Sequence, residues 1–276
     1  MTRFVIVDGH SQIYRAIHSP ASSAIRNSKG KIVGGIVAFF KIFDSLLDVL
    51  KPDYFVVTLD GPREELKRRE LFPEYKANRT SLPKEISWQV GEIVKILKGM
   101  KVPTLRIKSW EADDAIASLV DICASPEIEI VIVTRDKDLQ QVLQPGVVIY
   151  EPITAGWIDH RVAAANWGVA VNQITEVQCL MGDTADNIPG VPGVGKVKAT
   201  KLIQQYGTAR KVWKCREELT PAVRRALDAF DVQLGYNLVE MRRDLSINLD
   251  SEQLEWNGYN RHSLRHAFRA LGLVRH

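Results

Sequence analysis

Nine acidic residues, standing singly or in close groups, are the side chains whose types and spacing suggest chemistry. They are Asp8, Asp60, Glu111, Asp113, Asp114, Asp136, Asp138, Asp183 and Asp186. Gathered in one site, so many carboxylates would repel one another and raise their pKa values unless cations neutralised them. Oxygen ligands without His or Cys favour Mg²⁺ or Mn²⁺ over Zn²⁺. Because the acids outnumber what one ion needs, the sequence predicts two metal ions.

Two divalent ions about 3.5–4 Å apart are suited to phosphoryl chemistry. One ion lowers the pKa of a bound water and directs the hydroxide at phosphorus, while the other stabilises the leaving oxygen. No Ser, Cys or His nucleophile is then required. The sequence offers no competing triad, since His10 and His18 are isolated and are expected to be structural or phosphate-contacting. The predicted reaction is hydrolysis of a phosphodiester bond.

The elements that would position the acids alternate between β-branched runs and segments with helical periodicity. Predicted strands are Arg3–Val7, Tyr54–Leu59, Thr104–Ile107, Ile128–Thr134 and Val147–Tyr150. Predicted helices between them are Gly34–Leu50, Ile86–Met100 and Glu111–Cys123. This alternation is typical of an α/β fold with a mainly parallel central sheet flanked by helices.

Seven of the nine acids follow a predicted strand directly or lie in the next helical turn. Each of them alone could be a helix cap or an acid that favours the helix dipole. However, the carboxyl ends of parallel strands meet at one edge of a sheet, where ligands bind. The repeated coincidence therefore predicts that the acids converge there.

Net charge and its distribution indicate a polyanionic partner. The net charge is only +4, but residues 196–225 hold nine Lys or Arg against two acids, and residues 63–84 hold seven against four. Lys and Arg placed on phosphates release condensed counterions. Solvated helix faces explain such stretches equally well, so this pattern alone leaves both interpretations open.

Bulk composition indicates a globular protein of the cell interior. Hydrophobic residues make up 45 % and charged residues 25 % of the 276 positions, and no apolar run approaches a membrane span. The first residues reach Asp8 too early for a signal peptide. Cys123, Cys179 and Cys215 lack metal-binding spacing. We expect a cytoplasmic, nucleoid-associated protein.

A glycine-rich turn at residues 187–196 precedes a Lys-rich helix. Gly190, Gly195 and Lys196 match the beginning of a P-loop, but Val197 stands where Ser or Thr must bind magnesium and no strand precedes the motif. A turn that lets the backbone approach a DNA phosphate, with helix N–H groups as donors, fits better. A plain connector between two helices is the alternative interpretation.

The chain divides into two predicted domains. Residues 1–168 form an α/β core that includes an insertion at about 62–85, with short helices broken at Pro73. Residues 169–276 form a helical DNA-binding domain whose helix–turn–helix element covers about 180–207. Its predicted helices lie before Gly182, near Lys196–Tyr206, from Thr220 and after Asn260.

Six motifs resemble the 5′ nuclease family, which comprises the N-terminal domain of bacterial DNA polymerase I, its stand-alone bacterial and phage relatives and, more distantly, flap endonucleases. The similarity covers nearly the whole chain. The motifs are Val7-Asp8-Gly9 with Tyr14-Arg15, Leu59-Asp60, residues 69–79 (RELFPEYKANR), Glu111-Ala112-Asp113-Asp114, residues 134–139 (TRDKDL) and residues 181–191 (MGDTADNIPGV).

This resemblance implies a PIN-like 5′ nuclease core with a helical arch. It implies a 5′–3′ exonuclease and structure-specific flap endonuclease of DNA replication and repair, cutting near single-strand/duplex junctions. It implies two Mg²⁺ ions, for which Mn²⁺ can substitute. The residues resembling ligands of the more deeply held ion are Asp8, Asp60, Glu111, Asp113 and Asp114. Those resembling ligands of the second ion, some through water, are Asp136, Asp138, Asp183 and Asp186.

Basic and aromatic residues also acquire expected roles from the resemblance. Lys76 and Arg79 resemble arch residues that steer the scissile phosphate, and with Asp113 and Asp114 they form the predicted catalytic set. Tyr75 is expected to stack on a base, and the phosphate-contacting residues are Arg15 and Arg68. The glycine turn resembles the family's helix–three-turn–helix, which holds duplex DNA and a potassium ion. Its expected DNA contacts are Gly190, Gly193, Gly195, Lys196 and Lys198.

Two positions depart from the family pattern. Trp110 stands where Tyr is usual, and Lys196-Val197-Lys198 replaces an acid, a Lys and a hydroxyl residue, which moves the positive charge by one position. No polymerase or proofreading motif is present, so we expect a stand-alone nuclease or an isolated domain, with a DNA polymerase acting in trans as its protein partner. Two alternatives are a PIN-like RNase and a non-catalytic binder of branched DNA.

Overall fold

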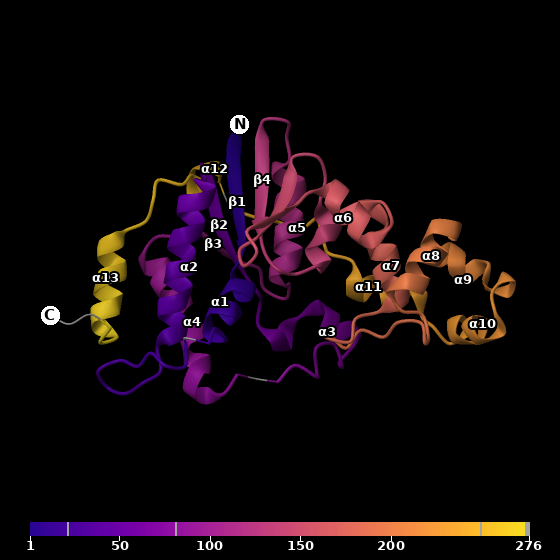
Figure 1. Cartoon of the computed structure of the whole chain (residues 1–276), viewed down its shortest axis with the longest axis horizontal. Helices are drawn as coiled ribbons and strands as arrows, with labels where there is room; N and C mark the ends of the chain where they lie inside the picture. The colour runs from indigo at the N-terminus through magenta and orange to yellow at the C-terminus, as the bar shows by residue number, and fades with distance from the viewer. Residues whose placement is uncertain (21, 81, 249, 274–276) are drawn as a thin grey trace.

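A six-stranded sheet forms the centre of the protein (Figure 1). The computed structural model describes residues 1–20, 22–80, 82–248 and 250–273. The strand order is β3-β2-β1-β4-β5-β6, and only the β5–β6 pair is antiparallel. The strands are β1 (Thr2–Asp8), β2 (Tyr54–Leu59), β3 (Thr104–Arg106), β4 (Ile128–Val133), β5 (Val147–Glu151) and β6 (Gly156–Ile158). The predicted, mainly parallel sheet is confirmed.

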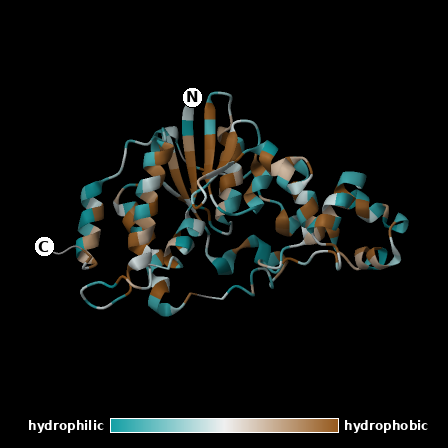
Figure 2. Cartoon of the chain, viewed as in Figure 1, coloured by the Kyte–Doolittle hydropathy of each residue, from teal (hydrophilic) through white to brown (hydrophobic). Residues whose placement is uncertain are grey.

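Both faces of the sheet are buried, which explains the continuous β-branched runs of its central strands. In β1, Phe4 and Ile6 face the layer that contains α5 (Ala112–Cys123), whereas Val5 and Val7 face the layer of α1, α2 and α4. The bounds of that second layer are α1 (Gly9–Ile17), α2 (Gly34–Leu50) and α4 (Lys84–Gly99). Figure 2 shows the strands as the most hydrophobic elements, with polar residues on the outer helices.

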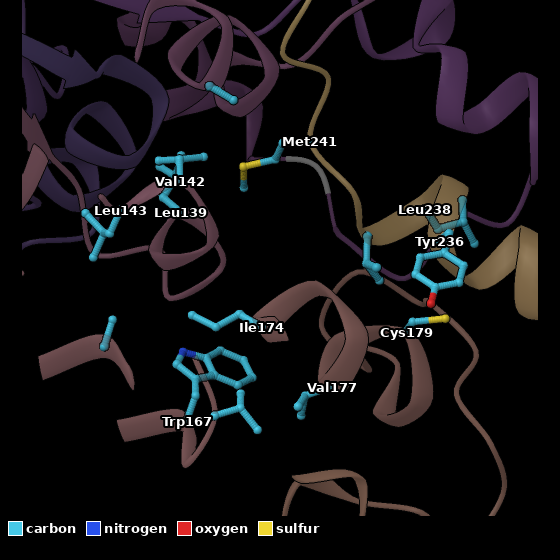
Figure 3. Packing of buried hydrophobic residues seen from close by; sticks show 14 of the residues in the cluster. Leu139, Val142, Leu143, Trp167, Ile174, Val177, Cys179, Tyr236, Leu238 and Met241 are labelled. Atoms are coloured by element: carbon cyan, nitrogen blue, oxygen red, sulfur yellow. The ribbon is translucent and has the colours of Figure 1, made fainter. Parts of the chain in front are cut away.

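A helical half extends from the α5 side of the sheet. Its elements are η2 (Asp138–Val142), α6 (His160–Trp167), η3 (Val171–Gln173), α7 (Ile174–Met181), α8 (Lys196–Tyr206), α9 (Ala209–Lys214), η4 (Arg216–Glu218), α10 (Pro221–Asp228) and α11 (Val232–Val239). Leu139, Ile174, Val177 and Met241 belong to the same buried cluster as the sheet residues (Figure 3). The core is therefore continuous from the sheet into the helical half.

The last two described helices are α12 (Ser251–Leu254), which lies beside β2 with Leu254 in the cluster of the α5 side, and α13 (Arg261–Ala270), which lies on the opposite side of the sheet (Figure 1). The ring of Trp256 lies 4.8 Å from that of Phe55, and Phe268 lies 5.9 Å from Phe40, measured between centroids. This placement differs from the sequence-based assignment of residues 169–276 to one helical domain. Aromatic residues spaced along an otherwise polar tail bury themselves on α2 and β2 rather than on α8–α11.

The insertion between β2 and α4, residues 62–83, contains η1 (Arg63–Glu65) and α3 (Lys67–Leu71). Pro73 follows closely after α3, and the next described residues, 74–78, form turns. Proline lacks an N–H and disfavours the helical conformation in the residue before it. The predicted short helices are present and end before Pro73, but turns rather than a further helix follow this proline among the described residues of the insertion.

Across the described residues, we find no helix with the length and apolar character that crossing a membrane requires.

Candidate active site

Acidic residues from three strand ends meet at one edge of the sheet. Asp8 ends β1 and caps α1, where it accepts a hydrogen bond from Ser11 N–H at 3.1 Å. Its other oxygen accepts one from Thr134 Oγ1, at the end of β4, at 2.8 Å. Asp60 follows β2 and accepts from the N–H of Ala112, the first residue of α5, at 2.8 Å. These bonds tie β1, β2, β4 and α5 together at the predicted edge.

Four of the acids have raised pKa values. Burial, with the charges of Asp60 and Asp136 adding to it, raises the pKa of Asp8 to about 7. Burial and the charge of Asp136 raise the pKa of Asp138 to about 7. The pKa of Asp113 is raised well above its usual range by burial and then by Asp136 and Asp8, and burial raises that of Asp136. These carboxylates lie close enough to repel one another, so a cation among them would be strongly favoured.

Basic residues of the insertion reach the same acids. Lys76 Nζ donates to Glu111 and lies 3.3 Å from Asp186, which also accepts from Arg79. Burial opposes ionisation of Glu111, but the charges of Lys76 and Arg68 lower its pKa to about 2. Lys137 lies 3.1 Å from Asp183 and, against the opposing effect of burial, lowers its pKa.

Backbone contacts fix the insertion over the turn that carries Asp183 and Asp186. Lys76 N–H donates to the Asp186 carbonyl at 2.8 Å, and Asn78 Nδ2 donates to the Thr184 carbonyl at 2.8 Å. A pocket opens between this contact and the helical half. It is lined by Tyr75, Glu111, Asp113, Asp138, Gln178, Asp183 and Asp186, among others. Together with Asp8, Asp60 and Asp136, the acids of this pocket are called the carboxylate cluster below.

The structure separates Asp114 from the carboxylate cluster. Asp114 is completely buried, and both of its oxygens accept hydrogen bonds from Arg68, at 2.6 and 2.8 Å. It also accepts from the N–H groups of Glu111 and Arg242. The predicted role of Asp114 as a metal ligand and catalytic residue does not fit a carboxylate whose oxygens already accept four hydrogen bonds.

Arg68 and Tyr75 are also buried, contrary to their expected places on a DNA-contacting surface. Arg68 is 6 % exposed and donates to Glu111, to Asp114 and to two backbone carbonyls at the C-terminal end of α11, those of Leu238 and Glu240. Tyr75 is 3 % exposed, and its hydroxyl donates to Glu111 at 2.8 Å. A phosphate contact by Arg68 and base stacking by Tyr75 are therefore not supported by these positions. The sequence could not separate buried from exposed cations within one basic stretch.

Sequence reasoning did not identify two residues that support the acids, Thr134 and Gln178, whereas His10 was expected to be structural or phosphate-contacting. Thr134 donates to Asp8, and Gln178 of α7 donates to Asp138 at 2.7 Å. His10 accepts from Asp60 N–H at 2.9 Å, and burial lowers its pKa, so it is a neutral acceptor here. Thr134 was visible as the end of the β4 run, but nothing in the sequence marked Gln178.

The donor set fits a hard divalent cation, because it offers several buried carboxylate oxygens with raised pKa values. Within the described part of the chain, no group of three or more His, Cys, Asp or Glu side chains is already arranged around a common metal position. Glu111 and Asp186 are instead bridged by Lys76. Metal binding would therefore require these side chains to rearrange.

The glycine turn between α7 and α8 presents an exposed surface. Gly193 has φ +75° and, like Gly195, Lys196 and Lys198, is exposed, so these residues are accessible to DNA. Gly190 serves packing instead, because a Cβ there would lie 2.3 Å from the Met181 carbonyl. Lys196 donates to the Asn166 carbonyl at 3.1 Å and Lys198 to that of Gly193 at 3.4 Å. Arg15 is half-buried on α1 and donates to Gln12 at 3.2 Å.

Comparisons with known proteins identify the family. Residues 3–168 match the family model of the 5′–3′ exonuclease N-terminal resolvase-like domain, and residues 169–262 match that of the 5′–3′ exonuclease C-terminal SAM fold. The chain therefore belongs to the 5′–3′ exonuclease family. It is an enzyme of the 5′–3′ exonuclease class, which confirms the predicted exonuclease function and sets the two alternatives aside.

Comparison with individual proteins supports the same family assignment. The chain is 31 % identical to a 5′–3′ exonuclease of Aquifex aeolicus, over 92 % of this chain and 87 % of that protein. It is 32 % identical to the thermostable DNA polymerase I of Thermus aquaticus, covering 90 % of this chain but only 29 % of the polymerase. It thus spans under a third of that longer relative.

Solved structures share the fold. The structure matches T5 5′-exonuclease with bound divalent metal ions (zinc) at a TM-score of 0.72 and 23 % identity, covering 87 % of this chain and 90 % of the other. It matches the catalytic core of Rad2 in complex with DNA substrate at a TM-score of 0.66 and 18 % identity, covering 99 % and 88 %.

Proposed function

We propose that the chain is a divalent-metal-dependent nuclease that hydrolyses DNA near single-strand/duplex junctions, with the carboxylate cluster as its catalytic centre. The observation that carries this proposal is the group of buried or half-buried acids at the sheet edge, Asp8, Asp113, Asp136 and Asp138, whose burial and mutual repulsion raise their pKa values. The bound divalent metals of T5 5′-exonuclease support the same type of site.

Two Mg²⁺ ions, or Mn²⁺ in their place, would be held by the carboxylate cluster. When bound, such ions supply an activated water and stabilise the leaving oxygen. Asp8, Asp60, Glu111 and Asp113 would hold one ion. The ligands of the other would be Asp136, Asp138, Asp183 and Asp186. Thr134 and Gln178 keep Asp8 and Asp138 oriented by direct hydrogen bonds.

Lys76 and Arg79 would serve the scissile phosphate. Both already bind carboxylate oxygens at the mouth of the pocket, and phosphate oxygens offer the same kind of acceptor. Cations aimed at the reacting phosphate stabilise the charge that develops in the transition state. Exchange of Asp186 for phosphate would convert these structural ion pairs into substrate contacts.

The glycine turn would hold the DNA backbone through exposed N–H groups at the start of α8, with K⁺ bound by backbone carbonyls of the turn. Gly193, Gly195, Lys196 and Lys198 are the exposed residues that support this assignment. Rad2, which shares the fold, is known in complex with DNA. Since the substrate is DNA, we place the enzyme at the nucleoid in the cytoplasm, with a DNA polymerase in trans as its protein partner.

Cleavage of a 5′-labelled flap duplex tests the proposal. We expect short labelled products with Mg²⁺ and none with EDTA. Asp113→Asn should reduce the single-turnover rate by about 100-fold or more while DNA affinity persists, as expected for loss of transition-state electrostatics. Asp48→Asn, an exposed acid on α2, is the matched control and should cleave normally. Undiminished cleavage by Asp113→Asn, or in EDTA, would refute the assignment of the centre.

A further inference from the structure

Three glutamines are almost completely buried beside the carboxylate cluster. Gln140 and Gln141 lie in η2, and Gln178 lies in α7; they are 8 %, 5 % and 4 % exposed, respectively. A buried amide destabilises the fold unless both of its ends, the carbonyl oxygen and the NH₂ group, find hydrogen-bond partners. The partners of each glutamine therefore indicate what its polar side chain does.

Gln178 joins the carboxylate cluster to Gln141. Its Nε2 donates to Asp138 Oδ1 at 2.7 Å, and its Oε1 accepts from Nε2 of Gln141 at 3.3 Å. The two ends of an amide are nearly equal in shape, so a half-turn of the Gln178 amide would exchange them. Its carbonyl oxygen would then face the Asp138 carboxylate, and two acceptors would repel each other. Asp138 therefore receives an N–H donor only while Gln178 is held in its present orientation.

Backbone groups fix the orientation of Gln141 in turn. Its Oε1 accepts from the Met241 N–H at 3.1 Å and from the Thr175 hydroxyl at 3.3 Å, and its Nε2 donates to the Val239 carbonyl at 3.2 Å. A backbone N–H only donates and a carbonyl only accepts, so a flipped Gln141 would lose both backbone bonds. Its NH₂ group must therefore face the Gln178 carbonyl oxygen. Gln141 and Gln178 are called the glutamine relay below.

The backbone that fixes Gln141 is the C-terminal end of α11. The carbonyls of Leu238 and Val239 lie in the last helical turn, where carbonyls lack partners within the helix. Arg68 Nε donates to the Leu238 carbonyl at 3.0 Å, and Gln141 donates to the Val239 carbonyl. Arg68 also donates to Glu111. One helix end thus supports an acid of the first proposed ligand set through Arg68 and an acid of the second through the glutamine relay.

We propose that Gln141 is a positioning residue of the nuclease. It holds the Gln178 amide with its NH₂ group toward Asp138, so that this carboxylate is presented to a divalent cation in one orientation. The inference rests on the proposed function, in which Asp138 is a ligand of the second ion. Hydrogen bonds from residues around a metal site orient its ligands, and their loss typically lowers metal affinity about 10- to 100-fold. Gln141 acts through Gln178 rather than on the metal or the substrate.

Gln140 shows what a glutamine kept only for packing would look like. Its Oε1 accepts from the indole N–H of Trp167 in α6 at 3.0 Å, and this bond leads away from the acids. A glutamine that merely satisfies buried polar groups would respond to substitution as Gln140 does. Because the two neighbours share the same element, chemistry and near-complete burial, Gln140 provides the matched control for Gln141.

Mn²⁺ titration of the DNA-free enzyme, with the free ion followed by electron paramagnetic resonance, tests the proposal. We expect Gln141→Met to weaken one of two Mn²⁺ sites about 10-fold and to leave the other within about 2-fold. Gln141→Asn, which keeps an amide but is one methylene shorter, should weaken the same site. Gln140→Met should leave both sites within about 2-fold of the parent enzyme. Thermal unfolding verifies that each variant is folded.

A double variant separates positioning from a general effect on the fold. If Gln141 acts through Gln178, then Gln141→Met added to Gln178→Met should weaken Mn²⁺ binding no further, within about 2-fold. In single-turnover cleavage of the flap duplex by Gln141→Met, the Mn²⁺ concentration at half-maximal rate should rise about 10-fold. The rate at saturating Mn²⁺ should change by less than about 3-fold, because the reacting groups are intact.

Three results would overturn the positioning role. Gln141→Met could leave both Mn²⁺ sites of a two-site parent enzyme unchanged, it could act no differently from Gln140→Met, or its loss could persist in full in the Gln178→Met background. Each of these results would leave the proposed function intact. A parent enzyme that binds no Mn²⁺ would instead contradict the proposed function, and the role of Gln141 with it.

Discussion

The insertion places two kinds of basic side chain beside the acids at the edge of the sheet, and these side chains differ in burial. Arg68 is enclosed between Glu111, Asp114 and the carbonyls of Leu238 and Glu240, so it joins the insertion, α5 and the helical half. Arg79, in contrast, has a side chain that is 50 % exposed. The first type of contact is part of the folded framework, whereas the second type can exchange a carboxylate for a substrate phosphate. Burial separates Arg68 from Arg79, whereas Lys76, whose side chain is 12 % exposed between Glu111 and Asp186, lies between the two types.

Breaking the framework contact should have the largest effect on stability. Arg68→Met would leave Asp114 buried without its partner, and removing one member of a buried ion pair typically costs about 3–5 kcal/mol. Arg68→Lys keeps the charge but loses the two-pronged geometry, so its loss should be intermediate. Urea unfolding measures both. A change below about 1 kcal/mol in Arg68→Met would contradict the framework role.

The Arg68 variants also test the framework role of Arg68 through the positions at which they cut DNA. Because Arg68 ties the helical half, where we propose that DNA binds, to the acids of α5, Arg68→Lys should spread the cleavage position over neighbouring phosphates. Its binding should keep the salt slope of the parent enzyme, since a buried Arg contacts no phosphate. If the slope decreased by about 1, Arg68 would be a phosphate contact after all.

Replacing Lys76, which we propose to exchange its carboxylate partners for the substrate phosphate, should affect the cleavage rate more than the stability of the fold. Lys76→Met should lower single-turnover cleavage by about 100-fold, the magnitude seen when a transition-state electrostatic contact is lost. Arg68 and Tyr75 still hold Glu111, so the free energy of unfolding should decrease less than in Arg68→Met. A variant that cuts normally would remove Lys76 from the proposed mechanism.

The pH dependence of stability distinguishes Asp8 and Asp138, which lie among other acids, from Glu111, which is paired with basic residues. The pKa values of Asp8 and Asp138, both about 7, exceed the unfolded value near 3.8. The folded protein therefore binds more protons than the unfolded chain between these values, and stability falls as pH rises through this window. Glu111, with a pKa of about 2, contributes stability above about pH 4.5 that is lost only in strong acid. In EDTA, the Tm should decrease by about 4 °C or more from pH 5 to pH 8, and Asp8→Asn should flatten this change. A Tm that rises over this range would contradict the crowding of unpaired acids.

The smallest effects are expected at the glycine turn, where a glycine required for packing can be compared with one that we propose contacts DNA. Gly190 belongs to the framework, so Gly190→Ala should destabilise the protein through its clash with the Met181 backbone. A Cβ on Gly195 meets nothing within 4 Å, so Gly195→Ala should fold normally and weaken DNA binding only a few-fold. Equal stability of the two variants would contradict their separate roles.

Periodicity and strand-end positions predicted much of the fold. Tyr54–Leu59, Gly34–Leu50 and Lys196–Tyr206 have the predicted bounds, because apolar patterning and Gly207 leave little choice there. The convergence of acids follows from parallel topology alone. In contrast, β6 is too short to show a pattern, and the short helix α6 was not predicted.

The partners of charged side chains could not be predicted from the sequence. Arg68 and Arg79 lie in one basic stretch, yet only the first is buried. Asp113 and Asp114 are adjacent and chemically equivalent, but the helical periodicity of α5 turns one toward the acids and the other toward Arg68. Such distinctions depend on contacts 43 to 170 positions away along the chain. The same long-range packing places α13 on α2.

Anomalous diffraction from crystals grown with Mn²⁺ addresses the catalytic centre most directly. We expect two peaks at the carboxyl edge of the sheet, bounded by Asp8, Asp113 and Asp136, with Lys76 displaced from Glu111. In Asp113→Asn crystals at least one peak should disappear. Peaks confined to other surfaces, or their complete absence at millimolar Mn²⁺, would show that these acids do not form a metal-dependent nuclease centre.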